Sequence, residues 1–137
     1  MTDTDKISPD VEKLLQDKNL AFVATLMKDG SPQITPTWID LIDGVIIVNT
    51  AEGRIKQRNL SRDQRIAISI VDRNNPYNMV TIRGKVIEQT NLDADKHIDK
   101  MAKKYLGVEK YPFGITGEKR ILLKIIPQKI FHLAPQS

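Results

Sequence analysis

Residues 20–49 read LAFVATLMKDGSPQITPTWIDLIDGVIIVN, which is three apolar segments separated by two Asp-Gly pairs. An Asp-Gly pair between apolar segments is a strong hairpin signal, because a type I′ turn needs positive φ at both central residues. The pattern predicts turns at Asp29-Gly30 and Asp43-Gly44. The predicted strands cover residues 20–28, 31–42 and 45–49. Three strands joined by two hairpins form an antiparallel β-meander.

Pro36 lies in the middle of the second predicted strand. Proline has no N–H to donate to a neighbouring strand, so this strand is expected at an open edge of the sheet. In a ligand-binding protein, the unpaired backbone groups of such an edge can contact the ligand.

Further along the chain, apolar patterns predict three more strands. They cover residues 65–72, 79–88 and 120–126, and residues 128–133 continue the last one after a bend at Pro127. Gly84, inside the second of these strands, suggests a bulge or the close approach of another backbone.

Two segments carry helix signals. Ser8-Pro9 places an N-cap serine before a proline at the first helical position, and the helix is expected to stop near Asn19. Thr90 and Asp93 resemble a capping box, and an amphipathic pattern runs from there to Gly107. The lysines of its predicted outer face are Lys96, Lys100, Lys103 and Lys104.

About six consecutive strands with two longer helices predict a mainly β, antiparallel fold. A sheet of this size must close or pair to protect its edges. We therefore predict a small closed or split β-barrel with flanking helices. It forms one domain over residues 8–137, and residues 1–7 are expected to be a disordered lead-in.

Composition narrows the function. The 137 residues contain no cysteine, which excludes disulfides and thiolate chemistry and is compatible with the expected cytoplasmic location. The polar, acidic N-terminus is not expected to be a signal peptide, and no apolar run reaches the roughly 18 residues of a membrane span. A net charge of +4 suits an anionic ligand, whereas 5% aromatic residues are too few for a row of nucleic-acid stacking platforms.

The segment after the third predicted strand is the best candidate site. It places Thr50, Gly53 and the cations Arg54, Lys56 and Arg58 within nine residues. On a helix, Arg54 and Arg58 share a face, and a helix starting near Gly53 would aim free N–H groups at whatever these cations meet. This is the chemistry of a phosphate site, and the alternative is a solvated basic helix.

Other site classes lack their motifs. There is no G-x-G-x-x-G, Walker or G-x-S-x-G motif. His97 and His132 lie on different predicted elements, and His97 is expected at the surface of its helix, on the polar side. A protein without an acid, base or nucleophile constellation can still perform redox chemistry when a cofactor carries the reaction.

Several motifs in combination resemble a known family. They are Asp29-Gly30-x-Pro32-Gln33-Ile34-Thr35-Pro36-Thr37-Trp38, then Asn49-Thr50-x-x-Gly53-Arg54-x-Lys56-x-Arg58-Asn59-Leu60, then Asn75-Pro76-Tyr77 and Ile82-Arg83-Gly84. Over residues 8–133 the chain resembles the split-β-barrel flavin and deazaflavin oxidoreductases, the FMN-binding split-barrel relatives of pyridoxamine 5′-phosphate oxidase. The likeness is greatest to the branch that uses coenzyme F-420.

The resemblance implies a homodimer of six-stranded barrels with a cofactor in each of two clefts at the interface. It implies that the cations of the basic segment hold the cofactor phosphate with help from the Thr50 hydroxyl. It also implies that residues 35–38 lie along the ring and that residues 75–77 reach over from the other subunit. The implied cofactor-binding residues are Thr35, Pro36, Thr37, Trp38, Asn49, Thr50, Arg54, Lys56, Arg58, Asn59, Asn75, Pro76 and Tyr77.

The implied activity is hydride transfer from reduced F-420 to a conjugated small-molecule acceptor. No side chain stands out as a proton donor, and the sequence does not identify the substrate. The alternatives are an FMN-dependent oxidase or flavin reductase of the same fold, and a non-enzymatic flavin- or tetrapyrrole-binding protein. A nucleic-acid-binding barrel is disfavoured by the sparse aromatic residues.

Overall fold

The computed structural model describes residues 5–134, and most of them lie in seven strands and three helices. The strands are β1 (Ala21–Leu26), β2 (Pro32–Thr37), β3 (Asp40–Ile42), β4 (Val45–Ala51), β5 (Arg65–Asp72), β6 (Asn75–Thr90) and β7 (Arg120–Leu133). The helices are α1 (Pro9–Gln16), α2 (Ile55–Arg62) and α3 (Ala94–Leu106).

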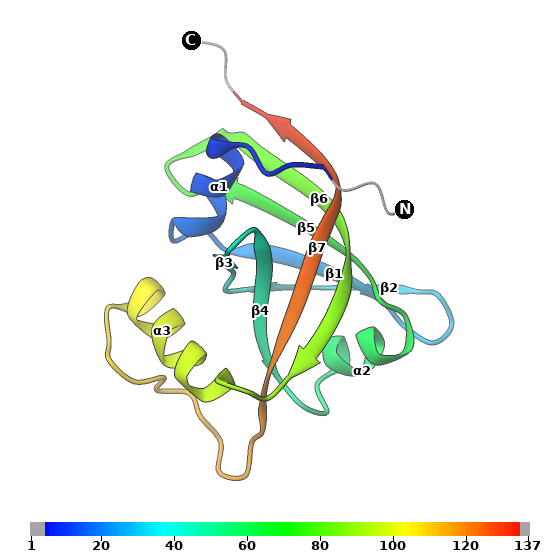
Figure 1. Cartoon of the computed structure of the whole chain (residues 1–137), viewed down its shortest axis with the longest axis vertical. Coiled ribbons are helices and arrows are strands. Elements are labelled where there is room, and N and C mark those ends of the chain that lie inside the picture. The colour runs from blue at the N-terminus through cyan, green and yellow to red at the C-terminus, as the bar shows by residue number, and fades with distance from the viewer. Residues whose placement is uncertain (1–4, 135–137) are drawn as a thin grey trace.

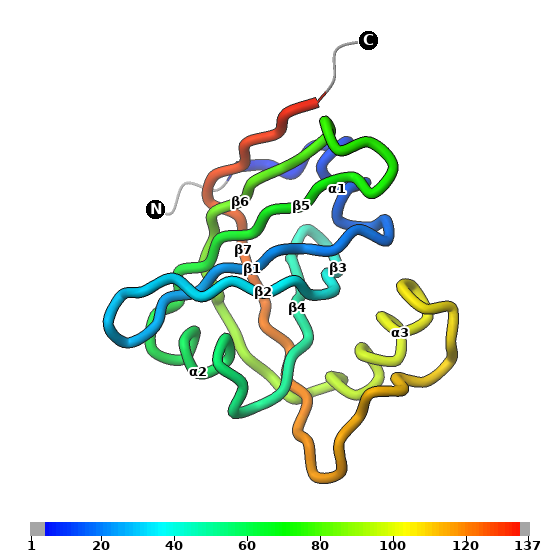
Figure 2. Tube along the Cα trace, turned by 180° about the vertical axis from the view of Figure 1, so that it is seen from behind, coloured from blue at the N-terminus to red at the C-terminus, as the bar shows by residue number. Residues whose placement is uncertain are grey.

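All seven strands form one antiparallel sheet in the order β2-β1-β5-β6-β7-β4-β3 (Figure 1). The first and last strands of this order, β2 and β3, are consecutive in the chain, with only Trp38 and Ile39 between them. The curved sheet therefore closes on itself as the predicted barrel. Helices α1 and α2 lie at opposite ends of it, and α3 packs against β4 and β7 (Figure 2).

The predicted strand 31–42 is divided, which is why the sheet has seven strands and not six. Its first half, β2, pairs with β1, and its second half, β3, pairs with β4. Within residues 5–134, β2 has no second neighbour in the sheet, so Pro36 lies on an open edge as predicted. Pro36 stands opposite Phe22 of β1.

The two Asp-Gly turns differ. Asp43 and Gly44 both have positive φ, at 50° and 78°, which confirms the two-residue type I′ turn between β3 and β4. At the other turn only Gly30 has positive φ, and Met27 N–H donates to the Ser31 carbonyl. The β1–β2 connection is therefore a five-residue loop, and the prediction of a type I′ turn there is wrong.

Gly84 marks a close backbone approach, as its position in a strand predicted. It stands opposite Pro127 in β7, next to a shift in the β6–β7 register. A Cβ built on Gly84 would lie 2.5 Å from the Ile126 carbonyl oxygen. Because Gly84 leaves this space free, β7 continues through Pro127 as one strand of 14 residues.

The barrel interior is filled by branched aliphatic side chains from the strands and from helices α1 and α2. The largest of those that are completely buried include Leu15, Ile39, Ile46, Leu60, Ile68, Ile82, Leu123 and Ile125. Burying a side chain of this size contributes about 1.5–3 kcal/mol. This cluster is what holds α1 and α2 against the sheet.

The helix starts are partly as predicted. Ser8 Oγ accepts from the Val11 N–H at 3.3 Å, which confirms the N-cap of α1. The capping box proposed for α3 does not form, because Asp93 is in the left-handed region and its side chain makes no capping bond. Thr90 Oγ1 instead accepts from the Leu92 N–H at 3.1 Å.

Residues 5–7 of the predicted lead-in contact the sheet, and residues 1–4 lie outside the described part. Asp5 Oδ2 accepts from the Ile130 N–H at 2.9 Å, and Ile7 packs against the core. Among residues 5–134, no helix combines the length and apolar character needed to cross a membrane.

Candidate functional site

A cleft of about 260 Å³ opens where the bend after β2, the end of β4, the start of α2 and the loop before β7 come together. We call it the cationic cleft. It brings together seven of the residues that the sequence predicted to bind a cofactor. They are Pro36, Thr37, Trp38, Asn49, Thr50, Arg54 and Lys56.

Trp38 reaches the cleft because the chain bends between β2 and β3, and α3 holds that bend. The Tyr105 hydroxyl accepts from the Ile39 N–H at 3.1 Å, and Lys104 Nζ donates to the Ile39 carbonyl at 2.6 Å. Burial lowers the pKa of Lys104 to about 8. Lys104 therefore turns toward the protein, and the predicted lysine face of α3 is not entirely in solvent.

Aromatic rings form one wall of the cationic cleft. Trp38 stacks on Tyr105 with ring centroids 5.2 Å apart and an interplanar angle of 6°. Tyr111 meets Trp38 edge-on at 5.9 Å, and Phe113 meets Tyr111 edge-on at 5.7 Å. A rigid apolar wall of this kind suits a planar ring system.

Positive charge also gathers in the cleft. Arg54 and Lys56 come from the start of α2, and Arg120 begins β7. Glu118 Oε1 accepts from Arg54 Nη2 at 3.0 Å and from Arg120 Nη1 at 2.8 Å. Glu118 thus pairs with two of the three cations, so the three cations together leave a local excess of positive charge.

Lys56 is the cation that this arrangement leaves uncompensated. It is half-buried, and its pKa is lowered first by burial and then by the charges of Arg54 and Arg120. No ion pair within residues 5–134 includes it. An anion in the cleft would offset both the desolvation and the repulsion.

Thr50 adds a hydroxyl to the same cleft. Its Oγ1 is buried and has no hydrogen-bond partner in the described part of the chain. Buried polar atoms are nearly always paired, so an unpaired hydroxyl on a residue that lines a cleft is a candidate ligand contact. Cations together with this hydroxyl are a donor set that fits a phosphate group.

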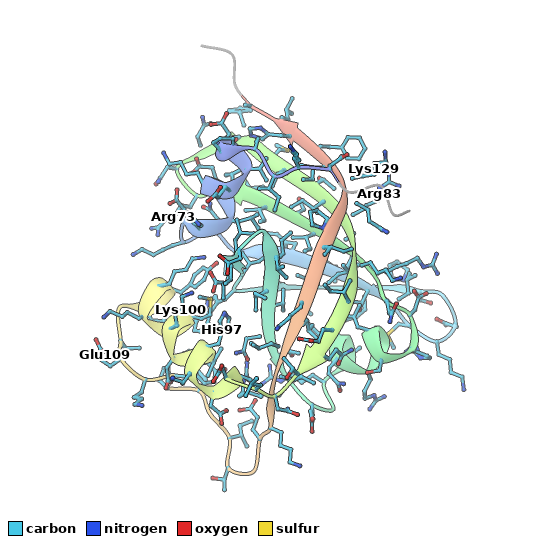
Figure 3. All side chains as sticks on the ribbon, in the orientation of Figure 1. Arg73, Arg83, His97, Lys100, Glu109 and Lys129 are labelled. Atoms are coloured by element: carbon cyan, nitrogen blue, oxygen red, sulfur yellow. The ribbon has the colours of Figure 1, made fainter. Side chains whose placement is uncertain are left out.

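A buried polar network lies behind the cleft, and it includes His97. His97 Nε2 lies 3.0 Å from Asp40 Oδ2, and His97 Nδ1 lies 3.1 Å from Asn49 Nδ2. Figure 3 shows His97 and Lys100 on α3. Only 7% of His97 is exposed, so the prediction of a surface histidine is wrong. The helical pattern did not show that this side of α3 faces β4.

Asp40 gives this network a pH dependence. Burial opposes its ionisation, but hydrogen bonds from His97 and Lys100 outweigh burial and lower its pKa to about 2. Because the folded-state pKa lies below the unfolded value of 3.8, the stabilisation is complete above pH 4 and is lost as the pH falls toward 2.

At pH 7 the Asp40→Asn variant is expected to be about 1–2 kcal/mol less stable than the wild type. When the pH is lowered from 4 to 2, the stability of the variant is expected to fall by less than that of the wild type. Urea unfolding at several pH values measures both effects. Parallel pH profiles for the two proteins would contradict the assignment.

The remaining sequence-predicted residues lie outside the cleft lining. Thr35 is on β2, with its Oγ1 buried and unpaired within residues 5–134. Arg58 is exposed on α2. Asn59 donates to Thr25 Oγ1 at 2.9 Å and ties α2 to β1. Residues Asn75–Tyr77 begin β6 at the end of the sheet near α1 (Figure 1), and Tyr77 is 73% exposed.

Five lining residues were not predicted from the sequence. They are Leu20, Ile98, Tyr111, Phe113 and Arg120. The two aromatic residues lie in an irregular connection without a periodic pattern, and Arg120 looks like an ordinary first residue of a strand. Arg120 could have been found only from its pairing with Ala51 across β4 and β7, which the fold supplies and the sequence pattern does not.

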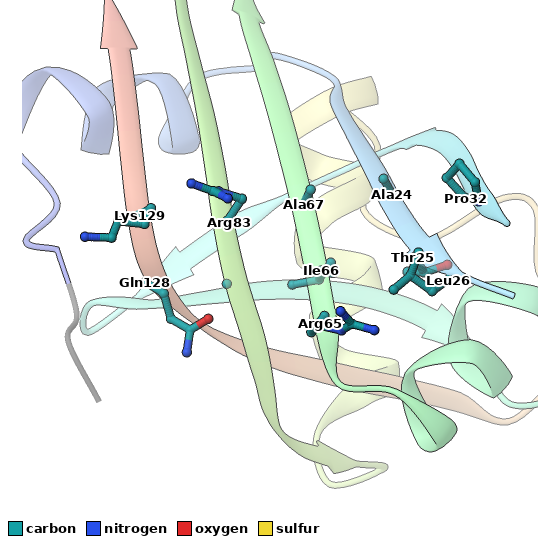
Figure 4. A pocket seen from close by; sticks show the side chains of 11 residues that line it. Ala24, Thr25, Leu26, Pro32, Arg65, Ile66, Ala67, Arg83, Gln128 and Lys129 are labelled. Atoms are coloured by element: carbon teal, nitrogen blue, oxygen red, sulfur yellow. The ribbon is translucent and has the colours of Figure 1, made fainter. Parts of the chain in front are cut away.

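A second hollow, the outer groove, runs over the outside of β1, β5, β6 and β7 and measures about 630 Å³ (Figure 4). Its lining includes Ala24, Ala67 and Gly84. Arg83 and Lys129 are paired across β6 and β7 at one side of the groove. This groove does not overlap the cationic cleft.

The chain belongs to the pyridoxamine 5′-phosphate oxidase family, whose model matches residues 7–134. An F-420 reductase has a similar structure, with a TM-score of 0.77 and 23% identity over 88% of this chain and 94% of that one. Group A Streptococcus HupZ gives a TM-score of 0.70 and 23% identity over 93% and 94%. A conserved hypothetical protein from Mycobacterium tuberculosis gives 0.71 and 19% over 100% and 94%.

No curated protein sequence matches the chain. The likeness to the solved structures confirms the split-barrel fold.

Proposed function

We propose that this protein is an oxidoreductase that uses reduced coenzyme F-420 to transfer hydride to a conjugated small-molecule acceptor. The observation that carries the proposal is the meeting of Arg54, Lys56 and Arg120 with the aromatic wall in one cleft. Membership of the pyridoxamine 5′-phosphate oxidase family and the likeness in fold to an F-420 reductase support it.

In this proposal the cationic side of the cleft binds the cofactor phosphate. Lys56 and Arg54 would neutralise its charge, and the Thr50 hydroxyl would donate to one of its oxygens. A hydrogen bond to a charged group contributes about 1.5–3 kcal/mol. The unpaired Thr50 Oγ1 and the lowered pKa of Lys56 are what such a contact would relieve.

The aromatic side would receive the cofactor ring. Trp38 is fixed against Tyr105, so it offers an apolar surface of set orientation. The neighbouring residues Pro36 and Thr37 lie on the open edge of β2. Bound F-420 supplies the hydride, and the protein supplies orientation and exclusion of water.

FMN is the second candidate cofactor, because it also joins one phosphate to a planar ring. The three cations of the cleft suit either molecule. The family to which the chain belongs is also named for an oxidase, pyridoxamine 5′-phosphate oxidase. A carrier or sensor without turnover would use the same cleft.

A titration of the purified protein with four probes tests the proposal. The probes are F-420, its phosphate-free chromophore, FMN and riboflavin, followed by fluorescence. We expect F-420 to bind more tightly than FMN and each phosphorylated probe to bind more tightly than its phosphate-free form. Tight FMN binding with weak F-420 binding would favour the flavin alternative, and binding of neither would refute a redox role.

We further propose that two copies associate as a homodimer with the two cofactor clefts at the interface. Tyr77 is exposed and lies outside the cleft of its own chain, so it is available to a partner's cleft.

Light scattering is expected to give twice the mass of one chain. In that dimer, Tyr77→Ala is expected to weaken cofactor binding. A monomeric mass would exclude a contribution from residues 75–77.

A further inference from the structure

A continuous chain of hydrogen bonds connects the buried Asp40 to Arg120, which lines the cationic cleft. Asp40 contacts His97, His97 contacts Asn49, and Asn49 Oδ1 accepts from Arg120 Nε at 2.9 Å. Arg120 then contacts Glu118 at 2.8 Å. Asp40, Asn49, His97 and Arg120 are each less than 10% exposed, so water competes little with these bonds.

The orientation of the Asn49 amide is fixed by two unambiguous neighbours. Its Nδ2 lies 2.8 Å from the carbonyl oxygen of Ala94, which can only accept. Its Oδ1 meets Arg120 Nε, which can only donate. Exchanging the oxygen and nitrogen of the amide would break both bonds, so Nδ2 must be the atom that faces His97.

This orientation determines the tautomer of His97. Asn49 Nδ2 is a donor, so His97 Nδ1 at 3.1 Å must accept and carries no proton. The single ring proton is then on Nε2, where it is donated to Asp40 Oδ2 at 3.0 Å. The imidazole is therefore neutral, and both of its nitrogens are engaged.

Arg120 depends on this arrangement. Asn49 holds its Nε and Glu118 holds its Nη1, which leaves Nη2 without a partner in the described part of the chain. Its guanidinium carbon also lies 5.1 Å from the Tyr111 ring centroid. The group is held from three sides with one nitrogen left for a ligand in the cleft.

We infer that His97 is a positioning residue for the cationic cleft: as the neutral Nε2–H tautomer it fixes Asn49, and Asn49 aims Arg120 at a bound anion. This inference rests on the proposed cofactor site. His97 does not line the cleft, so it acts only through Asn49. The structure thereby assigns a role to a buried histidine that no site motif contains.

Two matched substitutions separate this role from simple packing. In His97→Asn, the side-chain oxygen can occupy the place of Nδ1 and accept from Asn49, but the contact with Asp40 is lost. In His97→Gln, the terminal amide can reach Asp40 as a donor, but nothing accepts from Asn49. Both variants retain a polar amide side chain at a buried position.

Binding of F-420 and FMN, each compared with its phosphate-free chromophore, is the first readout. His97→Asn is expected to keep the wild-type affinities. His97→Gln is expected to weaken the phosphorylated probe about 3- to 10-fold, the effect of one lost hydrogen bond, and to spare the phosphate-free one. Equal weakening by both variants, or by neither, would overturn the inference.

Nitrogen-15 NMR of the ligand-free protein is the second readout and does not depend on the cofactor. We expect the His97 proton on Nε2, and an Arg120 Nε–H that exchanges slowly in the wild type and in His97→Asn but quickly in His97→Gln. A proton on Nδ1 would overturn the inference. If neither cofactor binds the wild type, the proposed function fails while NMR still decides the role of His97.

Discussion

Replacing Lys56 by methionine is expected to weaken binding of the phosphorylated cofactor about 10- to 100-fold, which corresponds to roughly 1.5–3 kcal/mol for a hydrogen bond to a charged group. Methionine keeps most of the apolar stem and removes the ammonium group. The loss should be confined to F-420 or FMN, because their phosphate-free chromophores have no anion for Lys56 to meet.

The same substitution is expected to leave the ligand-free protein as stable as before or more stable. Lys56 is half-buried beside Arg54 and Arg120, and burial and both charges lower its pKa. Removing it relieves desolvation and repulsion. Thermal unfolding without ligand measures this effect. A clear loss of stability would mean that Lys56 is a structural residue.

Arg58→Ala is the matched control, because Arg58 is exposed on the same helix and does not line the cleft. It is expected to change cofactor affinity by less than about twofold, as is usual for screened surface charges. If Arg58→Ala weakens binding as much as Lys56→Met does, the phosphate lies further along α2, where the sequence motif also predicted it.

Replacing Gly84 by alanine is expected to destabilise the fold by about 3 kcal/mol and to lower the melting temperature by about 10 °C. The new Cβ would lie 2.5 Å from the Ile126 carbonyl oxygen and 3.2 Å from Ile125 Cγ2. The first neighbour is backbone inside the β6–β7 ladder, so the clash cannot be relieved by turning a side chain.

Gly114→Ala is the control for this substitution. Gly114 lies in the loop before β7, and a Cβ there would meet only Tyr111 Cδ2, at 4.0 Å. Its melting temperature is expected to stay the same or to rise slightly, because alanine restricts the unfolded chain. Similar losses in both variants would show that the β6–β7 approach is not tight.

The parts of the fold that were predictable depend on neighbours in the sequence. Asp43-Gly44 adopts positive φ at both residues, so the two amino acids alone indicate the turn. Ser8 caps the turn that immediately follows it. The β1–β2 connection was predicted less well, because Met27 and Ser31 close a wider loop around the same kind of pair.

The division of the strand 31–42 was not predictable in this way. Ile39 is held at the bend by Tyr105 and Lys104, which are more than 60 residues away in the sequence. Burial of His97 has a similar origin, because its partners Asp40 and Asn49 come from other elements. A helical pattern shows which side of a helix is polar, but it does not show which polar side chain becomes buried against other elements of the fold.

The succession of predicted strands along the sequence indicated the barrel class. The sequence alone also determined the hairpin order, the open edge at Pro36 and the grouping of Thr50, Arg54 and Lys56, because each of these depends on residues within a few positions of one another. Tertiary structure alone decided that Arg120, Tyr111 and Phe113 join them. β4 pairs with β7, about 70 residues later, and only that pairing places Arg120 beside Ala51 at the end of β4. Such long-range pairing follows from packing of the whole core, which no local pattern encodes.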